Sequence, residues 1–339
     1  MAGFDGLDVM LERVVRETDF SGVIEIREGD VVRFARAWGH AERERGIPIT
    51  LDTRFGIASG TKFLTALAIG HLIAEGRIEL DTRLSEVLAL DLPDYPPDIT
   101  IRHLLTHTSG IPDYYDEDKV ESFDTFALPI PFDRLLGPRD YLPFFPREPM
   151  KFAPGSAFSY SNGGYILLGV IVEELSGMGY QTYVARTILE PLGMSRSGFF
   201  AMDQLPEGTA IGYVAQPEGG WRTNFGILPI IGASDGGMFL TPGDLNRLWT
   251  AFWSGAILPA SLVEIYATPH VRAAADSARW YGHGLWMRER APGEWEHWLE
   301  GCDAGVSFQS IALRSTHQRI TVMSNTTDGA WPILRAMGR

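Results

Sequence analysis

Residues 57–67 have the sequence IASGTKFLTAL and predict the start of a buried helix that continues to about Gly76. Lys62 is the only charged residue within this stretch. Because positions i and i+3 share a helix face, we expect the side chains of Ser59 and Lys62 to touch. A serine in the first turn of a helix also lies among free backbone N–H groups, at the positive end of the helix dipole.

This Ser-x-x-Lys pattern has two interpretations. A desolvated lysine is shifted towards its neutral form and can take the proton from a neighbouring hydroxyl, which makes the serine a nucleophile. Alternatively, Ser59 is an N-cap and Lys62 is an ordinary solvated cation. The pattern is short, so the choice depends on the other segments of the chain.

Composition limits the classes of function. The chain has 339 residues, of which 45% are hydrophobic and 21% charged, as in ordinary globular proteins. Its net charge of −14 argues against a nucleic-acid or anionic-membrane surface. Residues 1–6 lack the basic and apolar regions of a secretory signal, and no apolar run has the length of a membrane span. We therefore expect a cytoplasmic protein of unknown oligomeric state that acts on a small molecule.

The periodic segments predict an α+β fold. Strands and a helix at both chain ends flank a mostly helical middle, so we expect one antiparallel sheet flanked by helices and built from both ends. Residues 1–75 plus 235–339 would form this lobe, and residues 76–234 an inserted helical lobe. The aromatic-rich segment 111–150 is expected to cover a cleft. Helices are predicted at 4–18, 84–88, 101–105, 165–175, 183–189, 244–253 and 331–337, and strands at 23–27, 31–35, 295–299, 307–313 and 320–324.

A second informative stretch is residues 152–165, FAPGSAFSYSNGGY, in which tight-turn signals lie on either side of Tyr160. Tyr160 and Asn162 are two residues apart and can point into one cleft. A tyrosine beside a lysine can relay a proton to a leaving group, and Asn162 can hydrogen-bond Lys62. The alternative is that Tyr160 is a packed turn residue and that Asn162 only adopts a turn conformation.

Together these motifs resemble the penicillin-recognising serine hydrolase superfamily, with its class C β-lactamases, D-alanyl-D-alanine carboxypeptidases, D-aminopeptidases and related carboxylesterases. The resemblance begins with Ser59-Gly60-Thr61-Lys62 and Tyr160-Ser161-Asn162, and extends in the right order over about residues 20–330. It implies the β-lactamase/transpeptidase-like fold. The further matching segments are 101–111, 152–177, 188–194, 234–238 and 322–326.

The resemblance also implies roles for individual residues. Ser59 would be the acylated nucleophile, Lys62 the base that activates it, and Tyr160 the proton relay. Asn162 would be the polar partner in the substrate site. The backbone N–H of Ser59 would supply half of an oxyanion hole, in which one donor is typically worth roughly 3 kcal/mol of barrier. Neither a cofactor nor a metal is expected.

The third motif departs from the family pattern, which has Lys or His, a small residue and Gly on a strand along the cleft. This chain has Leu299-Glu300-Gly301, by register with the following Asp303. The missing cation puts substrates with a carboxylate in doubt. It favours a neutral ester or amide, or an amine that Glu300 pairs. A shifted register would restore a cation as His297. In the unshifted register, the Cys302 N–H would be the second oxyanion donor.

Two other clusters contain residues that bind metals in some proteins. His103 and His107 have the i, i+4 spacing of a metal pair, but no third ligand stands at a telling distance. The acidic residues of segment 113–118 are interpreted as a solvated loop rather than a calcium site. The sequence therefore predicts a serine hydrolase for esters or small amides. A β-lactamase or D-Ala-D-Ala peptidase, a D-aminopeptidase, an acyltransferase and a non-catalytic binding protein remain alternatives.

Overall fold

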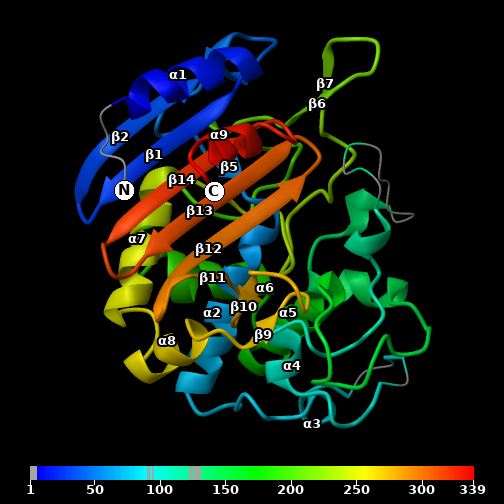
Figure 1. The fold of residues 1–339 in the computed structure, drawn as a ribbon. Coiled ribbons are helices and arrows are strands. Elements are labelled where there is room, and N and C mark those ends of the chain that lie inside the picture. Colours follow the sequence, from blue (N-terminus) through cyan, green and yellow to red (C-terminus); the bar gives the residue numbers. More distant parts are fainter. Residues whose placement is uncertain (1–5, 90–91, 94, 121, 123, 125–130) are drawn as a thin grey trace.

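The computed structural model describes residues 6–89, 92–93, 95–120, 122, 124 and 131–339. Within these residues, eight strands form one antiparallel sheet in the order β2-β1-β14-β13-β12-β11-β10-β9 (Figure 1). The strands are β1 Gly22–Glu28, β2 Val31–Trp38, β9 Val271–Arg272, β10 Trp280–Tyr281, β11 Trp286–Ala291, β12 Glu294–Asp303, β13 Val306–Leu313 and β14 Gln318–Ser324.

The two chain ends meet within this sheet, one strand in from its β2 edge. Strand β1 pairs with β14, with Gly22 opposite Ser324, and β13 and β14 form a hairpin. The expectation that both ends build one antiparallel sheet is therefore confirmed. The division of the chain into the two lobes proposed above remains our proposal.

Helices cover both faces of the sheet, because successive side chains of each strand point to opposite faces and both faces carry apolar residues. Ile24 and Val322 pack with the helices α1 and α9, whereas their neighbours Val23 and Met323 belong to the larger core around α2. Figure 1 shows α1 and α9 together on one face. The helices are α1 Leu7–Thr18, α2 Thr61–Ala74, α3 Leu84–Val87, α4 Ile101–Leu105, α5 Asn162–Ser176, α6 Tyr180–Val184, α7 Pro242–Ser254, α8 Ala260–Tyr266 and α9 Ala330–Ala336.

Helix α2 is the centre of the larger core. It is apolar nearly all round and is buried along almost its whole length, as expected for a helix enclosed by other elements. Helix α5 packs against it, and the neighbouring helices add further cover. Its first turn, which carries Lys62, is therefore held away from solvent. No helix within the described residues has the length and apolar character needed to cross a bilayer.

The predicted helices and strands are all present in the described residues, with shifted ends. Residues 4 and 5 of the first predicted helix lie outside the described residues, as do positions 121, 123 and 125–130 of the aromatic-rich segment. Elements missed by the prediction include β11, α8 and the hairpin of β6 Tyr213–Ala215 and β7 Trp221–Thr223. Most are too short for periodicity to reveal them. The remaining short elements are β3 His40–Glu42, β4 Ile47–Pro48, β5 Phe55–Gly56, β8 Phe239–Leu240, the single turns at Ala58–Gly60, Glu117–Lys119 and Phe132–Arg134, and the helical segments Pro138–Phe144 and Ala185–Leu189.

Candidate active site

Ser59 lies in a tight turn between β5 and α2. The turn spans Ala58–Gly60, and α2 itself begins at Thr61. Ser59 therefore does not cap α2, and the N-cap interpretation is wrong. Ala58 has a φ of 44°, a left-handed conformation that costs a residue with a Cβ about 1–2 kcal/mol. The Thr61 hydroxyl and the Gly237 N–H donate hydrogen bonds to the Ala58 carbonyl and hold this conformation.

Lys62 is the polar centre of the site. Its Nζ donates to Ser59 Oγ at 2.9 Å, to Asn162 Oδ1 at 2.7 Å and to the Asp235 carbonyl at 2.6 Å. The side chain is 1% exposed, and burial lowers the pKa of its ammonium from the ordinary value of 10.5. The three acceptors are a hydroxyl, an amide and a peptide carbonyl, so none of them carries a charge that would hold the proton. The i, i+3 contact between Ser59 and Lys62 is confirmed.

Tyr160 closes the site from the other side. Its ring centroid is 4.8 Å from Lys62 Nζ. Burial raises the pKa of the Tyr160 hydroxyl well above 10, more than the interaction with Ser59 lowers it. The ring packs on His107 at 4.3 Å between centroids and is stacked on Trp286 at 6.1 Å. The neutral phenol is therefore favoured in the free chain, which suits a proton relay better than a first base.

His107 supports this arrangement and is not positioned as a metal ligand. It follows the end of α4, with a φ of 59°, and is 1% exposed. Its Nδ1 accepts from the Ser161 N–H at 3.0 Å, while His103 Nδ1 accepts from the Thr100 N–H at 3.2 Å. The two histidines are thus not on one helix face, as the metal interpretation required. Across the described part of the chain, no three His, Cys, Asp or Glu side chains form a group that could hold a metal ion.

Asn162 is fixed by two acidic residues. Its Nδ2 donates to Glu117 Oε1 at 2.9 Å, which leaves Oδ1 facing Lys62. The carboxylate of Asp113 accepts from the backbone N–H groups of Asn162 at 2.5 Å and of Gly163 at 3.0 Å, at the start of α5. Burial raises the pKa of Asp113 to about 6 and also raises that of Glu117. The interpretation of this acidic segment as a solvated loop is therefore wrong for these two residues.

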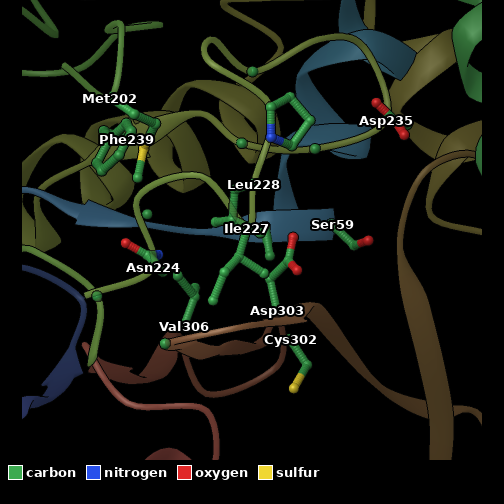
Figure 2. A pocket seen from close by; sticks show the side chains of 18 of the residues that line it. Ser59, Met202, Asn224, Ile227, Leu228, Asp235, Phe239, Cys302, Asp303 and Val306 are labelled. Carbon is green, nitrogen blue, oxygen red and sulfur yellow. The ribbon is translucent and has the colours of Figure 1, made fainter. Parts of the chain in front are cut away.

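A cavity of about 1130 Å³, including its mouth, opens beside Ser59. The described part of the aromatic-rich segment contributes Tyr114, Tyr115 and Tyr141 to its wall. That this segment covers the cleft stays a prediction. Apolar side chains form much of the remaining wall, and the carboxyl groups of three acids also line it. The apolar residues include Phe200, Met202, Ile227, Leu228, Phe239 and Val306, and the acids are Glu117, Asp235 and Asp303 (Figure 2).

Strand β12 carries the altered third motif past Ser59. A Cβ on Gly301 would lie 2.0 Å from the Ile57 carbonyl oxygen and 3.0 Å from the Ser59 nitrogen, so only glycine permits this approach. Glu300 accepts instead from Arg279 Nη2 at 2.7 Å and from Gln309 Nε2 at 2.6 Å. Its carboxylate is thus already paired with a cation of this chain.

The neighbouring residues of β12 divide between its two sides. In Figure 2 the Asp303 carboxylate points into the cavity, whereas Cys302 points away from it. Cys302 Sγ lies 3.6 Å from the Thr327 carbonyl oxygen, and burial raises the pKa of its thiol. Asp303 was not among the predicted site residues, although its position set the register of the third motif. The role of the Cys302 N–H as an oxyanion donor stays a prediction.

His297 does not restore the missing cation. It pairs with Met287 and Ala312 across the neighbouring strands and is 4% exposed. Its Nε2 lies 2.9 Å from the Ala267 carbonyl oxygen, and burial lowers the pKa of the imidazole to about 4. The shifted-register alternative is therefore wrong, because β12 holds this histidine in the core as a neutral group.

Comparisons with known proteins agree with this geometry. The family model described as Beta-lactamase matches residues 10–330. Esterase EstB of Burkholderia gladioli is 34% identical over 220 residues, which are 62% of this chain and 55% of the esterase. Penicillin-binding protein 4* of Bacillus subtilis (strain 168) is 28% identical over 300 residues, 84% of this chain and 63% of that protein. This chain thus spans less than two thirds of the length of either curated relative.

Solved structures extend the comparison to the whole fold. A penicillin binding protein from Bacillus halodurans has a TM-score of 0.90 and 38% identity, with 97% of this chain and 99% of that chain covered. The D-amino acid amidase of Ochrobactrum anthropi SV3 shares the fold, with a TM-score of 0.78 and 22% identity. The comparison covers 98% of this chain and 99% of the amidase. The chain has the β-lactamase/transpeptidase-like fold, and the family model matches nearly its full length. The chain therefore belongs to the beta-lactamase family of serine hydrolases.

Proposed function

We propose that this chain hydrolyses small carboxylic esters or amides through an acyl-enzyme on Ser59. The observation that carries the proposal is the 2.9 Å contact between Ser59 Oγ and the buried Nζ of Lys62. Burial lowers the pKa of this ammonium, and its three acceptors are uncharged groups. A lysine in this setting reaches its neutral form at lower pH than an exposed lysine, and can then accept a proton.

The proposed reaction follows from the positions of three side chains. Neutral Lys62 takes the hydroxyl proton of Ser59, while Ser59 Oγ forms a bond to the substrate carbonyl carbon. The proton then passes through the Tyr160 hydroxyl to the leaving alcohol or amine, whose bond to the carbonyl carbon breaks. In the second half of the reaction, water gives a proton to the same groups and its oxygen bonds to the acyl carbon. The bond from this carbon to Ser59 Oγ then breaks, Ser59 takes the proton back, and the acid leaves. Asn162, held by Glu117, keeps Lys62 aimed at Ser59.

The charges of the cavity support a substrate without a carboxylate. Among the described residues that line the cavity there are three acids and no arginine or lysine. A β-lactam or a peptide ending in D-alanine brings a negative charge, which these acids would repel. Leu299 stands where the usual third motif has its cation, and Arg279 is paired with the neighbouring Glu300. We therefore place the ester or amide activity ahead of a β-lactamase or D-Ala-D-Ala peptidase.

The test uses a fluorophosphonate probe, which labels an activated serine without needing the natural substrate. We expect labelling of the wild type and of Ser156→Ala, an exposed serine that serves as the matched control, and no labelling of Ser59→Ala. The mass shift should map to Ser59. Equal labelling of the wild type and Ser59→Ala would contradict the proposal.

Two alternatives have separate readouts. A β-lactamase would turn over nitrocefin faster than p-nitrophenyl acetate, whereas we expect the reverse order of kcat/KM. The altered third motif also fits a binding protein that has lost turnover. Such a protein would cleave neither compound and would keep its affinity for ligands in Ser59→Ala.

A further inference from the structure

His107 holds the backbone on both sides of Tyr160. Its carbonyl oxygen accepts from the Ser159 N–H at 3.0 Å, and its Nδ1 accepts from the Ser161 N–H at 3.0 Å. The imidazole also packs on the ring of Tyr160, with 4.3 Å between the centroids and 35° between the planes. One residue from a different part of the chain thus fixes the residues immediately before and after the phenol of the site.

The surroundings of His107 leave its ring little freedom to turn. Besides Tyr160, the rings of Tyr281, Tyr165 and Phe158 lie 4.6, 5.0 and 5.8 Å from the imidazole centroid. The residue is 1% exposed, and side chains in a close-packed interior are held by their neighbours. The acceptor nitrogen is therefore kept in one place relative to the Ser161 N–H.

The hydrogen bonds also determine which nitrogen of His107 carries the proton. Because Nδ1 accepts from Ser161, the neutral imidazole has its hydrogen on Nε2. Burial lowers the pKa of this imidazole well below 6.5, and the charge of Lys62 acts in the same direction. The ring is therefore neutral at neutral pH, and Nδ1 remains available as an acceptor.

Two local costs accompany this arrangement. His107 has a φ of 59°, a left-handed conformation that is uncommon for a residue with a Cβ. Its Nε2 is buried and has no hydrogen-bonding partner among the described residues. Costs of both kinds are typical of functional sites, where the surrounding structure holds a residue in an unfavourable state. They point to a role for His107 beyond filling space in the core.

We propose that His107 is a positioning residue, whose carbonyl and Nδ1 hold Ser159 and Ser161 so that the Tyr160 hydroxyl can deliver the proton to the leaving group. This inference rests on the proposed function, since the relay is one step of that reaction. His107 is not among the described residues that line the cavity beside Ser59 or the smaller pocket between Ser59 and Tyr160. Its effect on the reaction therefore passes through Tyr160.

The test compares two esters that differ only in a nitro group. p-Nitrophenolate is a stable anion that leaves with little help from an acid, whereas the phenolate of phenyl acetate is a poorer leaving group and gains more from a proton. His107→Gly permits the positive φ but removes the Nδ1 acceptor. We expect it to lower kcat/KM for phenyl acetate at least about 10-fold more than for p-nitrophenyl acetate, a part of what a positioned general acid supplies.

Two variants serve as the rescue and the matched control. His107→Asn also tolerates the positive φ, and its Oδ1 can accept from the Ser161 N–H, so it should recover most of the ratio between the two esters. His103 likewise accepts a backbone N–H at Nδ1, from Thr100 at 3.2 Å, but has no listed bond to the residues beside Tyr160. His103→Asn should therefore keep the wild-type ratio.

A double-mutant cycle separates positioning from general packing. Tyr160→Phe removes the relay hydroxyl and should itself cause the selective loss, so adding His107→Gly should not change the ratio further. An equal loss for both esters in His107→Gly, or a further selective loss in the double variant, overturns the inference. If His107→Gly does not fold, as judged by circular dichroism, His107→Asn takes its place. A wild-type ratio then supports the two hydrogen bonds as the positioning contacts, and a selective loss overturns them.

The fluorophosphonate probe distinguishes this inference from the proposed function. Its fluoride leaves without a proton from Tyr160, so Ser59 should be labelled in the wild type and in His107→Gly. Labelled Ser59 together with an unselective loss for the two esters overturns the inference alone. Failure of Ser59 to react in the wild type overturns the proposed function.

Discussion

Replacing Asp303 by asparagine should stabilise the folded chain above neutral pH. Burial raises the pKa of this carboxyl to about 7, and the charges of Glu117 and Asp235 act in the same direction. The folded chain therefore binds the Asp303 proton more tightly than the unfolded chain does. The stability that goes with this proton is fully present below the unfolded pKa of 3.8 and is lost as the pH rises through 7. Asparagine imitates the neutral acid at every pH.

The size of the effect follows from the two pKa values. Ionising a carboxyl with a pKa near 7 in the folded chain and 3.8 in the unfolded chain costs at most roughly 4 kcal/mol of stability at pH 8. Water in the open cavity reduces this cost, so we expect Asp303→Asn to gain about 1–3 kcal/mol at pH 8. For a chain of this size that corresponds to roughly 2–6 °C in Tm. Below pH 4 the gain should vanish.

The assay is thermal unfolding followed by circular dichroism at closely spaced pH values from 4 to 8. Asp328→Asn makes the same chemical change at an exposed position and serves as the control. We expect the Tm difference between Asp303→Asn and wild type to grow between pH 5 and pH 8, while the control stays flat. A difference that does not change with pH, or a lower Tm for Asp303→Asn at pH 8, would refute the reasoning.

Three other predictions concern the catalytic groups. For a neutral ester, kcat/KM should rise with pH, and the midpoint of this rise should lie below pH 10.5, because Lys62 must be neutral to act and burial lowers its pKa. Lys62→Met should abolish this rise and nearly all activity. An unchanged pH dependence in this variant would contradict the role of Lys62 as the base. In Gly301→Ala the new Cβ would meet the Ile57 carbonyl and displace the Ser59 N–H. Fluorophosphonate labelling should therefore slow about 100-fold or more, in line with loss of an oxyanion donor. Labelling at the wild-type rate, measured by stopped flow, would contradict this role of Gly301. Glu117→Ala should lower kcat about 10-fold with little change in KM for a neutral ester, because it removes the acceptor that holds the Asn162 amide against Lys62, and such hydrogen bonds are worth about 1 kcal/mol each. Glu117→Gln keeps an acceptor oxygen and should restore most of kcat. Failure of that rescue would argue for a role of the charge itself.

Several features of this protein follow from local sequence alone. The three-residue spacing of Ser59 and Lys62 fixes their contact because both lie within one helical turn of the chain. The sequence predicts strands at 23–27 and 320–324, and β1 and β14 are found there and pair with each other. Motif order over the chain indicated the family, which the match over residues 10–330 confirms. In each case the information lies in short-range periodicity or in the order of motifs.

Tertiary structure alone decided how the charges of the site are distributed. The motifs predicted the bond between Lys62 and Asn162, but no local pattern encodes the bond from Lys62 to the Asp235 carbonyl, 173 residues later. Glu300 was the predicted acid for a substrate amine, but in the structure its carboxylate is paired with Arg279, and Asp303 points towards the cavity. Strand periodicity says that neighbours point to opposite sides of a sheet. Which side faces the cavity is set by the packing of the strand against the turn at Ser59, and that packing depends on the whole chain.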